Sequence, residues 1–151
     1  FVFIGGAGCT IGLAILLVTV CKSKYAKDLG RIGFLPAIFN INEPLMFGTP
    51  IVLNLTLVIP FVLTPMVSGI IAWLATSAGL VNRVIVSAPW TLPGPIGAYL
   101  ATGGDWRAVV LNVLLIVLAC VIYYPFVKIW DKQYLSQEGP ADEAKLAADN
   151  A

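Results

Sequence analysis

The sequence predicts an all-α integral membrane protein with about three transmembrane helices and two re-entrant or broken hairpin segments. Composition is the first observation behind this class: of 151 residues, 59% are apolar and 11% are charged, and the mean hydropathy is +0.91. A soluble domain carries about 25% charged residues. The second observation is the order along the chain, in which long uncharged runs alternate with segments rich in proline and glycine.

The inventory of charged and metal-binding residues excludes several functions. The net charge is +1 and the basic residues are scattered, so we expect no nucleic-acid partner. The chain has no histidine, and its three cysteines, Cys9, Cys21 and Cys120, are too far apart for a paired metal motif. We therefore expect no metal site, no cofactor and no thiol catalysis.

The first element expected is a transmembrane helix over residues 1–20, which carry no charge. At about 1.5 Å per residue this run matches a hydrocarbon core about 30 Å thick. Gly8 and Gly12 form a GxxxG step, which predicts close approach of a neighbouring helix. The run lacks the basic start of a signal peptide, so we expect the chain to be a piece of a longer protein.

The charged segment 22–31 holds four basic residues, Lys22, Lys24, Lys27 and Arg31, and one acidic residue, Asp28. Such an excess of basic residues predicts a cytoplasmic loop. Residues 107–127 form another long apolar run and predict the last spanning helix. The polar residues 136–151 follow it, and we expect them to form a cytoplasmic tail that is disordered or loosely helical.

The middle of the chain contains one more uncharged run, residues 51–80, long enough to span despite Pro60 and Pro65. If this run leaves the cytoplasm and the last helix returns to it, segments 32–50 and 81–106 must each enter and leave on one side. The proposed inside then holds seven basic residues and the outside two: Lys22, Lys24, Lys27, Arg31, Lys128, Lys132 and Lys145 against Arg83 and Arg107.

Both segments are interrupted by proline and glycine, so neither is expected to be a continuous helix. Non-helical backbone at membrane depth is tolerated only where protein or a watery cavity satisfies its polar groups. Discontinuous helices of this kind often build the substrate sites of transporters. We therefore expect a polar cavity, in a fragment of a larger transporter domain.

Asn40, Asn42 and Glu43 are the first candidate site residues, and Glu43 is the only carboxylate expected at mid-membrane depth. Burying such a charge costs about 2.5–3.5 kcal/mol on insertion scales. Pro44 disfavours helix at the residue before it, so we expect an open tip whose polar groups suit the hydroxyls of a sugar. A structural tip, with Glu43 paired to a loop lysine or arginine, is the alternative.

Trp90 and Thr91 are the second pair of candidates, on a loop stiffened by Pro89 and Pro93. An indole face can stack on a sugar ring while a hydroxyl bonds its edge. An aromatic anchor at the membrane surface is the alternative for Trp90. Asn112, in the last apolar run, is expected to make an interhelical hydrogen bond.

Several ordered motifs then resemble one known family. They are residues 39–54 (FNINEPLMFGTPIVLN), Pro60-Phe61, residues 89–93 (PWTLP), residues 123–126 (YYPF) and residues 131–133 (DKQ). They look like the C-terminal part of the sugar permease, enzyme IIC, of the phosphoenolpyruvate-dependent phosphotransferase system, in its lactose/cellobiose/diacetylchitobiose branch. The similarity runs from Phe1 to about Gln137. Residues 1–135 would then belong to the transport domain and residues 136–151 to a cytoplasmic tail.

This resemblance implies a bacterial inner-membrane permease, usually a homodimer, that binds and translocates a β-linked disaccharide. A partner subunit, enzyme IIB, phosphorylates the sugar from a phosphocysteine at the cytoplasmic face, so this chain takes part in a transferase reaction without supplying that group. Glu43 matches the family's glutamate, which meets the hydroxyl to be phosphorylated; Asn42 lies beside it, and Trp90 matches an aromatic residue of the pocket.

The chain departs from the family pattern because the family's functional histidine and its dimerising half lie upstream of the segment present here. Two rival functions also stay open from the residues. One is a proton-coupled secondary sugar transporter that uses Glu43 as its proton site. The other is a membrane scaffold without transport, in which the broken segments only pack.

Overall fold

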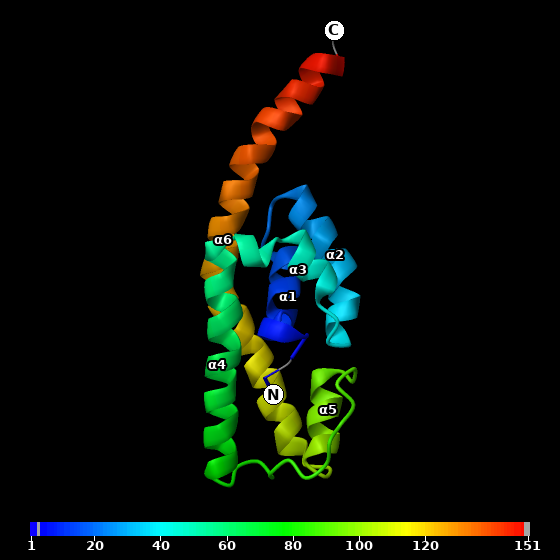
Figure 1. The fold of residues 1–151 in the computed structure, drawn as a ribbon, viewed down its shortest axis with the longest axis vertical. Helices are drawn as coiled ribbons and strands as arrows, with labels where there is room; N and C mark the ends of the chain where they lie inside the picture. The colour runs from blue at the N-terminus through cyan, green and yellow to red at the C-terminus, as the bar shows by residue number, and fades with distance from the viewer. Residues whose placement is uncertain (3, 150–151) are drawn as a thin grey trace.

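The computed structural model describes residues 1–2 and 4–149, with side chains described except at position 52 and positions 137–149. These residues form only helices and connecting segments, which confirms the all-α fold (Figure 1). The elements are η1 (Ala7–Cys9), α1 (Ile11–Thr19), α2 (Lys24–Ile38), α3 (Glu43–Gly48), η2 (Ile51–Leu53), α4 (Leu55–Ser77), α5 (Gly94–Ala101) and α6 (Trp106–Asp149).

The helices α4 and α6 are long and apolar enough to cross a membrane, over Leu55–Ser77 and Trp106–Ser136. They pack against each other along the long axis of the molecule (Figure 1). Pro60 and Pro65 lie inside α4 without ending it, and the hydroxyl of Thr64 donates to the carbonyl of Pro60 at 2.6 Å. Both predicted spans are therefore confirmed. The backbone of α6 continues through the predicted tail to Asp149.

The prediction of one spanning helix over residues 1–20 is wrong. The α-helical part is α1, with nine residues, and the glycines before it adopt left-handed backbone, with φ of 77° at Gly5, 91° at Gly6 and 77° at Gly8. Glycine adopts this conformation at no steric cost, whereas other residues rarely do. The first apolar run is therefore an irregular segment followed by a short helix.

The close packing predicted for Gly8 and Gly12 is present, although the two residues do not share a helix face. A Cβ atom on Gly8 would overlap the ring of Phe61, and one on Gly12 would lie 2.9 Å from Ala119 of α6. The hydroxyl of Tyr123 donates to the carbonyl of Gly8 at 2.7 Å. The N-terminal segment is thus held against both long helices.

The basic segment 22–31 is not a loop, because α2 begins at Lys24, and Ser23 accepts a hydrogen bond from the N–H of Ala26 at the helix start. Together α2 and α3 form a helical hairpin that turns at residues 39–42. The prediction of a non-helical tip at Glu43 is also wrong, because α3 begins at Glu43. Pro44 lies in the first turn of α3, where the missing proline N–H needs no partner.

The second hairpin has a different build. Residues 81–93 run without regular helix, and α5 returns beside them. Two backbone N–H groups of this arm, those of Ile85 and Val86, donate to the carbonyl of Ala101 at 2.9 and 3.3 Å. Asp105, ahead of α6, accepts hydrogen bonds from the backbone N–H groups of Asn82 and Arg107, which lower the pKa of this carboxyl.

The two hairpins point toward each other from opposite ends of the helical bundle, beyond one end of which only α6 extends (Figure 1). The α2–α3 hairpin descends from the end where α1 turns into α2, and the hairpin of residues 81–101 rises from the end where α4 stops. This is the arrangement that the balance of spans predicted for segments 32–50 and 81–106. Their tips meet, and the contact between them forms the candidate site.

Candidate functional site

Asn40 joins the two hairpin tips. Its side-chain Nδ2 donates to the carbonyls of Trp90 and Leu92 at 2.6 and 2.9 Å, and its Oδ1 accepts from the N–H of Gly5 at 2.8 Å. Its backbone has φ of 62°, a left-handed conformation that asparagine tolerates better than most residues. Both amide hydrogens are therefore engaged, and Asn40 positions Trp90 instead of offering donors to a ligand.

Asn42 also makes a contact within the chain. It is 6% exposed, and its Nδ2 donates to the carbonyl of Ala7 at 2.9 Å. Its backbone carbonyl accepts from the N–H groups of Leu45 and Met46 at the start of α3. The side chain thus links the turn to the irregular N-terminal segment.

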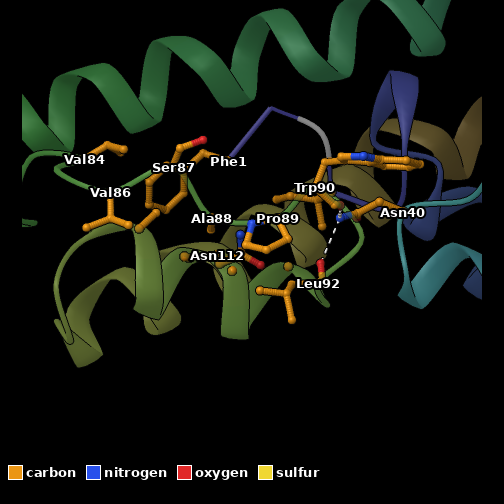
Figure 2. A pocket seen from close by; sticks show the side chains of 15 residues that line it. Phe1, Asn40, Val84, Val86, Ser87, Ala88, Pro89, Trp90, Leu92 and Asn112 are labelled. Atoms are coloured by element: carbon orange, nitrogen blue, oxygen red, sulfur yellow. Dashed lines mark hydrogen bonds between the residues drawn. The ribbon is translucent and has the colours of Figure 1, made fainter.

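A cavity of about 370 Å³ lies beside this junction. Figure 2 shows Asn40 and Trp90 at one end and Val84 and Val86 at the other. It is lined by Phe1, Ile4, Asn40, Val84, Val86, Ser87, Ala88, Pro89, Trp90, Leu92, Gly94, Gly97, Ala98, Ala101 and Asn112. An apolar wall with a few placed polar groups is the usual form of a small-molecule site.

Asn112 is the polar residue of this cavity whose role was missed in the sequence. It is 1% exposed, and its Oδ1 has no hydrogen-bond partner among the described residues, so the expected interhelical hydrogen bond is not made by this atom. A Cβ atom on Gly94 would lie 2.8 Å from that oxygen. A buried acceptor left unpaired costs about 1–3 kcal/mol, so a donor from water or a ligand would stabilise it.

Trp90 and Thr91 lie on the tip of the second hairpin. The Trp90 side chain lines the cavity and the residue is 72% exposed, so its indole is open to a ligand or to surrounding protein or lipid. Thr91 is exposed and is not among the lining residues. Of this pair, the structure brings Trp90 alone to the cavity.

Glu43 lies apart from that cavity. It is exposed in the first turn of α3, where the helix dipole favours a negative charge, and it is not a lining residue. In residues 1–2 and 4–136, whose side chains are described except at position 52, the recorded ion pair is that of Arg31 and Asp28, so a pairing of Glu43 with a loop cation is not seen. Asn40 and Trp90 are thus brought together, and Glu43 is presented on another face.

Comparison with known proteins places this geometry in a family. The profile of the family described as "Phosphotransferase system, EIIC" matches residues 1–65. The "Lichenan permease IIC component" of Bacillus subtilis is 43% identical over 98% of this chain and 33% of its own length. The "PTS system lactose-specific EIICB component" of Streptococcus mutans is 43% identical over 98% of this chain and 26% of its own length.

A solved structure is also similar. The transporter ChbC, described as the IIC component of the N,N'-diacetylchitobiose-specific phosphotransferase system, superposes with a TM-score of 0.86 and 42% identity, over 91% of this chain and 32% of ChbC. The chain thus spans a quarter to a third of the relatives it matches. It belongs to the EIIC family of the phosphotransferase system, as a fragment of the larger membrane domain.

Proposed function

We propose that this chain is part of the sugar-binding and translocating unit of a phosphotransferase-system permease for a β-linked disaccharide. The observation that carries the proposal is the junction of the hairpin tips: Asn40 holds the carbonyls of Trp90 and Leu92 beside a largely apolar cavity. An exposed indole on a positioned backbone suits the C–H face of a sugar ring. The names of the relatives, for lichenan, lactose and diacetylchitobiose, support this substrate class.

In this proposal Trp90 stacks on the sugar and Asn112 accepts a hydrogen bond from one of its hydroxyls. Thr91, next to Trp90 but outside the cavity lining, bonds the part of the sugar that extends beyond the cavity. Asn40 and Asn42 position the tips, because their Nδ2 groups bond to backbone carbonyls. An apolar wall with one buried acceptor fits a disaccharide, which has both C–H surface and hydroxyl donors.

Glu43, which lies on another face than the cavity, is proposed as the catalytic residue of the phosphorylation step, in which it orients, or takes the proton of, the hydroxyl to be phosphorylated. Its carboxylate is exposed and has no partner recorded among the described side chains. Because the chain covers about a third of ChbC, we propose that the wall facing Glu43 comes from the rest of the domain, including the histidine that the family carries upstream.

The remaining assignments follow from the same proposal. The phosphoryl group comes from the phosphocysteine of an enzyme IIB partner, in line with the fused EIICB composition of one relative. Residues 1–135 form part of the transport domain of a bacterial inner-membrane protein that is a homodimer at full length. Residues 136–151 and the basic start of α2 face the cytoplasm.

The test is equilibrium binding of cellobiose, lactose and diacetylchitobiose to the purified full-length protein. We expect Trp90→Ala to weaken binding of the preferred sugar about tenfold or more, which corresponds to about 1.4 kcal/mol. Trp106→Ala is the matched control, because Trp106 is similarly exposed but lies at the start of α6, away from the lining residues. Equal sugar affinity in the wild type and in both variants would contradict the proposed site and favour a membrane scaffold without transport.

The proton-coupled alternative is not favoured, because the relatives reported above are phosphotransferase-system components. Uptake assays separate the two mechanisms. We expect disaccharide uptake to stop when the soluble phosphorylating partner is deleted. Uptake that continues without the partner and stops with an uncoupler would support the proton-coupled mechanism instead.

A further inference from the structure

A second cavity, of about 360 Å³, lies beside the middle of α6, where α1 turns into α2. Its lining residues are Val20, Lys22, Lys128, Ile129, Asp131, Lys132 and Leu135. It shares no lining residue with the cavity at the hairpin tips. The proposed sugar site therefore makes no use of it.

The charge of this cavity is positive. Three of its lining residues are lysines, Lys22, Lys128 and Lys132, and none of them has a recorded ion pair within the described side chains. Its one carboxylate, that of Asp131, is 7% exposed and accepts the backbone N–H groups of Lys22 and Ser23 at 3.0 and 3.2 Å. The carboxylate is thus engaged by the chain ahead of α2, and the ammonium groups are available to an anion.

The depth of the cavity corresponds to a membrane surface. Lys128 is the first charged residue after the apolar run 107–127, and its Nζ lies 4.9 Å from the centre of the Tyr124 ring. Tyr134 stacks on Tyr25 and packs beside Trp130, with ring centres 5.1 and 5.3 Å apart. Tyrosine and tryptophan together with lysine mark the boundary between lipid tails and headgroups.

We propose that this cavity binds the headgroup of an anionic phospholipid. The ammonium groups of Lys22, Lys128 and Lys132 hold the phosphate, and the apolar lining side chains Val20, Ile129 and Leu135 pack against the glycerol and the first acyl carbons. A free phosphate would leave these apolar side chains without a partner. Basic pockets beside membrane helices are suited to anionic lipid headgroups for this reason.

The experiment uses the purified full-length protein in detergent and follows its melting temperature. It is titrated separately with dioleoylphosphatidylglycerol, dioleoylphosphatidylcholine and inorganic phosphate. A ligand that binds only the folded state raises the melting temperature, so we expect a rise with phosphatidylglycerol alone. The variant Lys22→Gln/Lys128→Gln/Lys132→Gln should need a roughly hundredfold higher concentration of this lipid for the same rise, at about fivefold for each lysine.

The matched control is Lys24→Gln/Lys27→Gln/Arg31→Gln, which removes the same charge from α2 at residues that do not line the cavity. This control should respond like the wild type. A second variant, Lys22→Arg/Lys128→Arg/Lys132→Arg, should respond like the wild type, which would show that the glutamine variant has lost charge and not its fold. Native mass spectrometry should find phosphatidylglycerol retained by the wild type and the control only.

Several results would overturn the proposal. They are an equal response to phosphatidylcholine or inorganic phosphate, an unchanged response in the cavity variant, and an equal loss in the control. A cavity variant that keeps its lipid response and loses binding of the purified phosphorylating partner would also overturn it, and would assign the cavity to protein docking.

Discussion

The two hairpins reach the middle of the molecule in different ways. The α2–α3 hairpin is helical on both arms, so its backbone groups bond within it and its turn needs only residues 39–42. The other hairpin has one helix, α5, and an arm of residues 81–93 without regular helix. The carbonyls of Trp90 and Leu92 on this arm accept from Asn40 of the first hairpin. The helical hairpin therefore supports the irregular one.

The largest effect is expected when Asn40 is replaced. Asn40→Ala removes three hydrogen bonds and places a Cβ-bearing residue without a polar side chain in left-handed backbone, at a total cost of about 3 kcal/mol. Relative to the wild type, amide hydrogen exchange in this variant should speed up more in residues 81–93 than in α2. Asn40→Gly keeps the left-handed backbone, so it should lose less free energy of unfolding but show the same faster exchange in residues 81–93. Unchanged exchange in both variants would contradict the role of Asn40 in supporting the second hairpin.

A smaller effect is expected inside the self-supporting hairpin. A Cβ atom on Gly33 would lie 2.5 Å from Leu45, so Gly33→Ala should overpack the α2–α3 contact and lower the free energy of unfolding by about 1–3 kcal/mol. Leu45→Val in the same chain should recover part of that loss. Gly97→Ala, whose nearest neighbour would be at 3.8 Å, is the control. Thermal unfolding measures both variants. Equal melting temperatures for Gly33→Ala and Gly97→Ala would contradict the tight contact between Gly33 and Leu45.

The cavity of the irregular hairpin should separate stability from binding. Asn112→Leu removes the unpaired acceptor and keeps the number and branching of the side-chain heavy atoms, so the free energy of unfolding should stay the same or rise by about 1 kcal/mol. Sugar affinity of the full-length protein should fall about tenfold, as for loss of one hydrogen bond. Stability that falls with unchanged affinity would show that Asn112 has a structural role only.

The smallest effect is expected at the base of the irregular hairpin. The pKa of Asp105 lies below its ordinary value of 3.8 because the N–H groups of Asn82 and Arg107 donate to it. Its contribution to stability is therefore complete above the unfolded-state pKa and is lost as the pH falls through the lower folded-state pKa. Asp105→Asn should therefore make the melting temperature fall slightly less steeply as the pH is lowered from pH 6 to pH 2, roughly the span of carboxyl titration. The same pH dependence of the melting temperature in the wild type and the variant would contradict this role of Asp105.

The long spans were predictable because an uncharged run of sufficient length has few other solutions in lipid. Residues 51–80 and 107–127 meet this condition, and α4 and α6 follow them. The balance of spans also predicted that two segments turn back, since it depends only on the number of crossings. Hydropathy alone did not reveal the break in residues 1–20, because glycines suit both a membrane helix and left-handed backbone.

The sequence indicated which segments carry the candidate residues, but not what each residue contacts in the fold. An asparagine amide can bond to a sugar or to a neighbouring carbonyl, and the local sequence of Asn40 does not distinguish these uses. Its partners lie 50 and 52 residues away, so only the tertiary fold shows them. Asn112 was identifiable as a carboxamide in an apolar run, but its orientation into a cavity depended on the placement of Gly94.

Cysteine cross-linking of the two tips tests the meeting of the hairpins most directly. In a full-length protein with its native cysteines replaced, Ile41→Cys and Thr91→Cys place one thiol next to Asn40 and one next to Trp90. This pair should form a disulfide rapidly on mild oxidation, whereas Ile41→Cys with Ser77→Cys, at the far end of α4, should not. Failure of the first pair, or equal cross-linking of both pairs, would contradict two hairpins that enter from opposite ends and meet at Asn40.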